Sequence, residues 1–91
     1  MRALVTGAAR RIGREITLYL AGRGYDVAVH YHSSKNEALS VVKEIRAKGR
    51  VAQMLEADIL NETDAMSLVP RASEALGGPL TLLVNNASIF E

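Results

Sequence analysis

A glycine-containing segment close to the N-terminus combines residue types that can bind phosphate. It runs from Thr6 to Gly13, reads TGAARRIG, follows a short apolar run and leads into a segment with helical periodicity. The N-terminus of a helix offers unpaired N–H groups and the positive end of the helix dipole, and glycine lets the backbone approach a pyrophosphate closely. We expect Gly7 to make a tight turn there and Gly13 to let the helix pack closely on the sheet.

The spacing of these glycines limits what the segment can bind. The sequence contains neither the G-x-G-x-x-G string of many dinucleotide sites nor the G-x-x-x-x-G-K string of P-loop proteins. The absence of the P-loop string argues against an ATPase or a GTPase. Gly7 and Gly13 are also compatible with an ordinary tight turn that binds nothing, so the loop by itself does not decide the function.

The residues after the second apolar run favour one dinucleotide over another. An NAD site needs a carboxylate there to accept hydrogen bonds from the ribose hydroxyls. The chain instead reads HYHSSK from position 30, and the first acidic residue is Glu37. Ser33 and Ser34 offer hydroxyl groups, and Arg11 in the first loop offers a cation, which together suit a 2′-phosphate. These residues therefore favour NADP(H).

Short apolar runs alternate with longer segments of helical periodicity along the whole chain. The alternation predicts the order β-α-β-α-β-α-β and therefore an α/β fold, a Rossmann-type parallel sheet in three layers (αβα). Asn61 can cap the third helical segment. Pro70 lies inside that segment and predicts a kink after Val69. The four expected strands are Arg2–Thr6, Asp26–Tyr31, Val51–Ala57 and Leu80–Asn85.

Three landmarks, in this order, resemble the short-chain dehydrogenase/reductase family. They are the loop from Thr6 to Gly13, Asp58 just after the third strand, and the sequence NNAS that ends at Ser88. The family pattern has glycine at two of these positions, where this chain has Arg11 and Ser88. Together with the strings HYHSS and NASIF, these departures are similar to the pteridine reductase branch. The landmarks are spread over the whole chain, so the resemblance covers all of it.

The resemblance implies a reaction and a set of binding residues. The reaction is the NADPH-dependent reduction of a C=O or C=N bond, in a pteridine for example, by a homotetramer. Ser88 and Phe90 match substrate-contacting residues of the pteridine reductase branch, although Phe90 is equally compatible with covering a sheet edge. The residues that the resemblance assigns to the cofactor NADP(H) are Gly7, Arg11, Ile12, Gly13, His30, Ser33, Ser34, Asp58, Asn86, Ala87 and Ser88.

The resemblance implies catalytic residues that this sequence does not contain. The family uses a tyrosine as the acid and a lysine one helical turn later. One Tyr-x-x-x-Lys spacing occurs, but Tyr31 ends an expected strand and Lys35 begins an expected helix, so the two do not share a helix face. We therefore expect the catalytic serine and the Tyr-x-x-x-Lys pair beyond residue 91. A non-catalytic NADP-binding module or sensor is the alternative.

The composition disfavours several other classes of protein. The chain has 91 residues, 48% of them hydrophobic, with no cysteine and a net charge of +1. This balance does not favour a nucleic-acid partner, so Arg10 and Arg14 are more typical of a solvent-exposed helix start. Without cysteine we expect no metal site. The sequence shows no run of about 18 apolar residues and no secretory signal pattern, so we expect no membrane partner and a cytoplasmic protein that acts on a small molecule.

The fourth expected strand would form an uncovered edge of the sheet. In the strand order 3-2-1-4 of dinucleotide-binding folds it lies outermost, yet Leu80–Asn85 is apolar on both faces. We therefore interpret residues 1–91 as the N-terminal NADP-binding part of a Rossmann domain that is truncated after its fourth strand. A partner chain that covers the same edge is the other interpretation.

Overall fold

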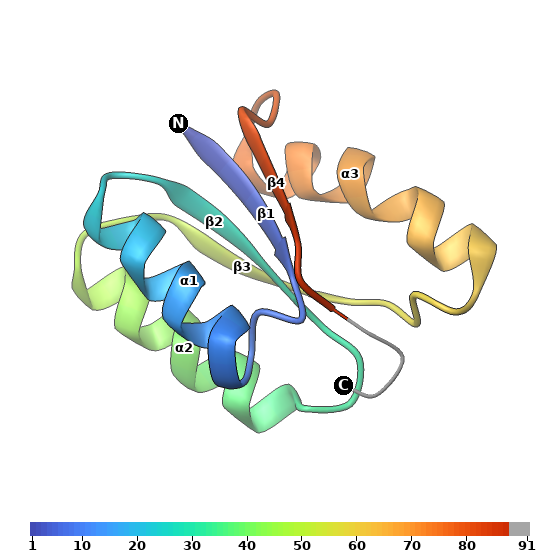
Figure 1. Ribbon diagram of the computed structural model, residues 1–91. Coiled ribbons are helices and arrows are strands. Elements are labelled where there is room, and N and C mark those ends of the chain that lie inside the picture. The colour runs from blue at the N-terminus through green and yellow to red at the C-terminus, as the bar shows by residue number, and fades with distance from the viewer. Residues whose placement is uncertain (88–91) are drawn as a thin grey trace.

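Strands and helices alternate along the chain in the computed structural model, which describes residues 1–87 (Figure 1). Four strands form one parallel sheet in the order β3-β2-β1-β4. The alternation expected from the sequence, and the Rossmann-type fold that it predicts, are thus confirmed. The elements are β1 (Arg2–Thr6), α1 (Arg11–Gly22), β2 (Asp26–Tyr31), α2 (Lys35–Ala47), β3 (Ala52–Glu56), α3 (Glu62–Leu76) and β4 (Leu82–Asn85).

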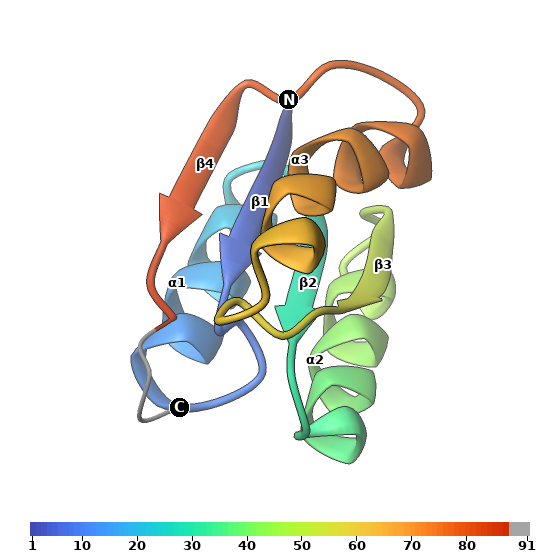
Figure 2. The same ribbon diagram turned by 90° about the vertical axis from the view of Figure 1, so that its right-hand side faces the viewer.

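Helices lie on both faces of the sheet, which makes three layers. α1 and α2 cover one face and α3 covers the other (Figures 1 and 2). Successive side chains of β1 point to opposite faces: Leu4 belongs to the same buried cluster as Leu68 of α3, whereas Val5 shares a cluster with Val42 of α2. The inner strands are apolar at their centres, residues 3–5 of β1 and 27–29 of β2, because each of them is covered on both faces. None of the helices described in residues 1–87 is long and apolar enough to cross a membrane.

Two strands are shorter than the sequence predicts. β3 covers Ala52–Glu56, and β4 begins only at Leu82. Just ahead of β4, the Thr81 N–H donates a hydrogen bond to the Arg2 carbonyl (2.8 Å), whereas the Arg2 N–H donates to the Thr81 hydroxyl (3.1 Å). A side chain thus supplies one of the two hydrogen bonds between the chain segments at that point, which a pattern of apolar residues cannot reveal.

The two ends of α3 show the expected capping. Asn61 Oδ1 accepts a hydrogen bond from the Asp64 N–H (3.0 Å), and Gly77 ends the helix with a φ of 81°. Between these caps the helix runs through Pro70 without interruption, at the place where we expected a kink. The capping fixes where the segment after β3 turns into α3, and that segment forms one wall of the site described below.

The carboxyl ends of the four strands lie along one edge of the sheet. Thr6 at the end of β1 pairs with Asn85 of β4, while Tyr31 at the end of β2 pairs with Glu56 of β3. The segments that follow these strands therefore meet at the same edge. In open parallel sheets, ligands bind outside this edge where the strand order reverses, and here it reverses between β1 and β4.

β4 pairs with β1 alone among the strands that the structure describes. Leu82 and Val84 pack, half-buried, against the core on the side of α1 and α2. Leu83 points to the opposite face and is 52% exposed. An apolar strand thus forms the open edge of the described sheet, as the sequence predicts.

Candidate functional site

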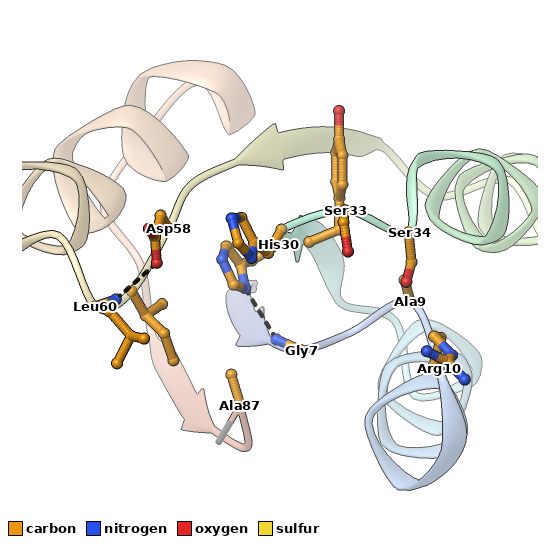
Figure 3. Close-up of a pocket in the computed structure, with 12 residues that line it drawn as sticks. Gly7, Ala9, Arg10, His30, Ser33, Ser34, Asp58, Leu60 and Ala87 are labelled. Atoms are coloured by element: carbon orange, nitrogen blue, oxygen red, sulfur yellow. Dashed lines mark hydrogen bonds between the residues drawn. The ribbon is translucent and has the colours of Figure 1, made fainter. Parts of the chain in front are cut away.

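A cavity of about 170 Å³ opens at the carboxyl ends of β1, β2 and β3 (Figure 3). Its walls come from the β1–α1 loop, the end of β2, the segment after β3 and the residue Ala87 after β4. Six of the residues that the sequence assigns to a cofactor lie in these walls. The lining residues are Gly7, Ala9, Arg10, His30, Tyr31, His32, Ser33, Ser34, Asp58, Ile59, Leu60 and Ala87.

Gly7 makes the turn that leads from β1 into the loop. Its φ of 63° lies in the region that favours glycine. A Cβ atom on Gly7 would lie 3.0 Å from the Ala87 Cα atom and 3.1 Å from Asn86 Nδ2. The expected tight turn is present, and it lies against the chain that leaves β4.

Gly13 packs against this turn and not against the sheet, which corrects the partner that we expected. A Cβ atom on Gly13 would overlap the Gly7 carbonyl oxygen and come within 2.6 Å of Asn86 Nδ2. Gly13 is buried in the first turns of α1. The glycine therefore allows the start of α1, the Gly7 turn and Asn86 to lie in direct contact.

The hydroxyl group of Thr6 connects the end of β1 to the segment after β4. It accepts hydrogen bonds from the N–H groups of Asn86 (2.9 Å) and Ala87 (3.1 Å). In addition, Asn86 Nδ2 donates to the Gly7 carbonyl (3.2 Å). Thr6 begins the loop motif, but the sequence does not single it out as a site residue, because its partners lie about eighty positions away along the chain.

His30 has a different environment from the one that the sequence predicts. The ring is 2% exposed. The Gly7 N–H donates to Nδ1 (2.9 Å), and Nε2 lies 2.9 Å from the Ala57 carbonyl oxygen. Both ring nitrogens are therefore bonded to backbone groups, and neither is free to hold a 2′-phosphate. Burial is the largest cause that lowers the pKa of His30 below its ordinary value.

The start of α2 offers groups that suit an anion. Ser33 and Ser34 line the cavity, and Ser34 is the N-cap residue of α2, yet its hydroxyl makes no capping hydrogen bond. His32, which the sequence leaves unassigned, is exposed and lies in the same wall. A hydroxyl and an imidazole beside the N-terminus of a 13-residue helix can bind a phosphate group.

Of the three arginines near the start of α1, one lies in the cavity wall. Arg10 is exposed, as expected, but it also lines the cavity, and its Nε lies 3.7 Å from Glu37 Oε2 in the first turn of α2. Arg11 begins α1 with an exposed side chain outside the cavity wall. Arg14 pairs with Glu44 of α2 (2.6 Å) on the surface between the two helices. The first acidic residue after β2 is thus engaged by an arginine.

The wall formed after β3 is mainly apolar. Ile59 and Leu60 lie beside Asp58, whose carboxylate accepts a hydrogen bond from the Leu60 N–H (3.0 Å). A flat aromatic base fits such a wall, with one carboxylate at its edge. Ile12, which the sequence also assigns to the cofactor, is 68% exposed at the start of α1 and lies outside the cavity wall.

Two further expectations concern the reaction. Tyr31 is buried at the end of β2, and Lys35 is the exposed first residue of α2. Because the two residues lie on different elements, they do not share a helix face as the tyrosine and lysine of the family do, which is what the sequence predicts. Ser88 and Phe90 lie outside the residues that the structure describes. Residues 1–87 contain no cluster of histidine, aspartate and glutamate that could hold a metal ion.

The described fold and cavity are those of a dinucleotide-binding domain. A family model described as short chain dehydrogenase matches residues 1–91, so the chain belongs to the short-chain dehydrogenase family. A 3-oxoacyl-[acyl-carrier-protein] reductase from Staphylococcus aureus is 45% identical over 87 residues, which are 96% of this chain and 35% of that protein. The chain thus spans about a third of the length of the curated relatives that it matches.

Solved structures show the same fold. A short-chain dehydrogenase from Burkholderia cenocepacia, in complex with NADP, superposes with a TM-score of 0.92 at 47% identity and covers 99% of this chain and 36% of that one. FolM alternative dihydrofolate reductase 1 from Brucella suis, also in complex with NADP, gives a TM-score of 0.89 at 42% identity and covers 99% and 37%. The resemblance to short-chain reductases is therefore confirmed for the fold and the family.

Proposed function

We propose that this chain forms the NADP(H)-binding part of an oxidoreductase that reduces a C=O or C=N bond in a small molecule. The observation that carries the proposal is the composition of the cavity where β2 meets α2. Ser33, Ser34 and Arg10 lie there, and the first carboxylate after β2, that of Glu37, is paired with Arg10. Donors without a free carboxylate suit a 2′-phosphate better than a ribose hydroxyl.

The remaining walls fit the other parts of this cofactor. The positive φ of Gly7 turns the chain sharply after β1, and the N-terminus of α1 follows this loop, which suits a pyrophosphate. Asp58 with its apolar neighbours suits the adenine. Arg11, at the start of α1, is proposed to reach the 2′-phosphate from the side opposite Ser34. When bound, NADPH supplies the hydride for the reduction.

The proposal also includes the class of substrate. Asn86 and Ala87 lie beside the Gly7 turn, and Ala87 lines the cavity. We propose that Ser88 and Phe90 contact a pteridine there. Support comes from the resemblance of the NASIF string to pteridine reductases and from the likeness to the Brucella suis enzyme. A soluble cytoplasmic homotetramer is part of the same proposal.

Cofactor titrations of the whole protein test the proposal. We expect NADPH to bind more tightly than NADH. Losing one charge-assisted hydrogen bond costs about 1.5–3 kcal/mol, so Arg11→Ala should weaken NADPH by about 10- to 100-fold and leave NADH nearly unchanged. Arg14→Ala is the matched control, because Arg14 pairs with Glu44 away from the cavity. Equal losses for both cofactors in Arg11→Ala would contradict the assignment.

Turnover assays separate the enzyme from a non-catalytic NADP-binding module. The whole protein is given NADPH with a dihydropteridine or with a 3-oxo ester, and NADPH consumption is followed by its absorbance. We expect oxidation that depends on one of these substrates. Tight NADPH binding without turnover of either class would favour the module.

A further inference from the structure

The imidazole of His30 joins two segments that carry the cavity. One is the Gly7 turn after β1, and the other is Ala57, the residue that follows β3. The ring itself belongs to β2, which lies between β1 and β3 in the sheet. Figure 3 shows the ring pointing from the end of β2 toward Gly7, with the hydrogen bond drawn. The side chain thus crosses the base of the phosphate-binding loop.

The partners of the two ring nitrogens allow only one protonation state. The Gly7 N–H is a donor, so Nδ1 must be the unprotonated acceptor. The Ala57 carbonyl is an acceptor, so Nε2 must carry the hydrogen. The ring is therefore the neutral Nε2–H tautomer. A second proton on Nδ1 would place two donors against each other at a residue that is only 2% exposed.

We propose that His30 is a positioning residue that holds the Gly7 turn in the shape that receives the cofactor pyrophosphate, and that it does so only as the neutral Nε2–H tautomer. The inference rests on the proposed function, since the turn matters through the dinucleotide that it binds. It differs from the role that the sequence predicts, in which His30 contacts the 2′-phosphate directly. The two roles have different consequences for NADPH and NADH, because both cofactors have the pyrophosphate and only one has the 2′-phosphate.

The charges that face His30 make protonation unfavourable. His32 approaches from the segment after β2 and Arg71 from α3, and both oppose a second positive charge on the ring. Arg10 lies in the same cavity wall, and the Asp58 carboxylate there is engaged by the Leu60 N–H. Burial is the largest cause that keeps the pKa of His30 below its ordinary value, and His32 and Arg71 add to it against the opposing effect of the hydrogen bond to Ala57. The positioning bond therefore persists at neutral pH and is lost on acidification.

The first test measures the protonation state of the His30 ring directly. Nitrogen chemical shifts of the two histidines are measured in the whole protein, without cofactor, from pH 8 to pH 5. We expect His30 to show an unprotonated Nδ1 and a protonated Nε2 at neutral pH, and to titrate below the ordinary pKa of histidine. The opposite tautomer, or a doubly protonated ring at neutral pH, would overturn the proposal.

The second test compares two substitutions that each resemble one ring nitrogen. His30→Asn places an acceptor near the position of Nδ1 and cannot be protonated, whereas His30→Gln reaches toward Ala57 and offers Gly7 no acceptor. We expect His30→Gln to weaken both NADPH and NADH about ten-fold at pH 7.5, and His30→Asn to keep both within about two-fold. His32→Asn is the control for the neighbouring histidine and should change NADPH alone.

The outcomes distinguish the proposal from the proposed function. A loss for NADPH alone in His30→Gln would mean that His30 contacts the 2′-phosphate, and unchanged binding of both cofactors would mean that it does not position the loop. Either result would overturn the positioning role while NADP(H) binding stands. Failure of the unmodified protein to bind either cofactor would overturn the proposed function and the positioning role with it.

Discussion

Arg11 occupies a backbone conformation that glycine adopts more easily. Its φ is 54°, and it is the one residue other than glycine with a positive φ among those described. The left-handed conformation costs such a residue about 1–2 kcal/mol. The side chain is exposed, so packing does not offset this strain. The arginine therefore costs stability at this position, which agrees with the binding role that we propose for it.

Replacing this residue should separate stability from binding. We expect Arg11→Gly to raise the free energy of unfolding by about 1 kcal/mol, because the strain is relieved, and to weaken NADPH as much as Arg11→Ala does. Urea denaturation and cofactor titration check the two effects. Arg14→Gly is the control of opposite sign, because a glycine inside α1 should destabilise it by about 1 kcal/mol. A destabilised Arg11→Gly protein would contradict the account.

The protonation of His30 should also affect stability. The fold lowers the pKa of this ring, so the unfolded chain, with a histidine pKa of about 6.5, takes up the proton first. The contribution of His30 is therefore complete above pH 6.5 and is lost as the pH falls toward the lower pKa of the folded protein. Urea midpoints at pH 7.5 and 5.5 should fall less in His30→Asn than in the unmodified protein. An equal fall in both would show that His30 does not contribute to the pH dependence.

At the scale of elements, the β1–α1 unit depends on the absence of side chains at two positions. Gly13 brings the start of α1 against the Gly7 carbonyl, and the Gly7 turn brings the loop against Ala87. Gly22, at the end of the same helix, has no neighbour within 4 Å of the place where a Cβ atom would lie. Glycine is therefore required for packing at Gly13, at the start of α1, and is not required at Gly22, at its end.

Substitution of these glycines tests the difference. We expect Gly13→Val to destabilise the protein by several kcal/mol or to prevent folding, because the side chain overlaps backbone that cannot move away. Gly7→Ala should destabilise less and chiefly harm cofactor binding. Gly22→Ala is the control and should be neutral or stabilising by up to about 1 kcal/mol. Thermal melts compare the three, and an unchanged melting temperature in Gly13→Val would rule out close packing.

The sequence predicts elements better than it predicts side-chain partners. Apolar periodicity and capping residues locate every helix and strand of residues 1–87, because those signals are local. The direction of the His30 ring depends on the Gly7 turn, which lies 23 positions away, so only the fold reveals it. The same limit explains why the sequence names Arg11 while the cavity wall contains Arg10. The positions of Ser33, Ser34 and Asp58 at this edge were predictable because each lies within two residues of the end or the start of an element.

At the scale of the whole molecule, the open edge at β4 governs how the chain behaves by itself. Leu83 is 52% exposed, and β4 has one strand neighbour among the described residues. An apolar edge of this kind pairs readily with another chain. The relatives extend well beyond the matched region, since the chain spans about a third of their length.

Expression of residues 1–91 by themselves tests this view. We expect no oxidation of NADPH with a carbonyl or a pteridine, because acid–base catalysis is worth about 10²- to 10⁴-fold and Tyr31 and Lys35 do not supply it. We also expect self-association in light scattering, with weak cofactor binding retained. The mass of the sample must first show that it ends at Glu91. Robust turnover by a monodisperse monomer would contradict both expectations.

The hydrogen bonds that the Thr6 hydroxyl group accepts can form only late in the synthesis of the chain. Its hydrogen-bond partners, the N–H groups of Asn86 and Ala87, leave the ribosome about eighty residues after Thr6 does. Contacts so distant in sequence are made late in folding. A nascent chain that contains β1, α1 and β2 already has Gly7, Gly13 and His30. It still lacks Asn86 and Ala87, whose N–H groups bond to Thr6 beside the Gly7 turn. The cofactor therefore meets a finished loop only after the fourth strand has emerged and joined the first.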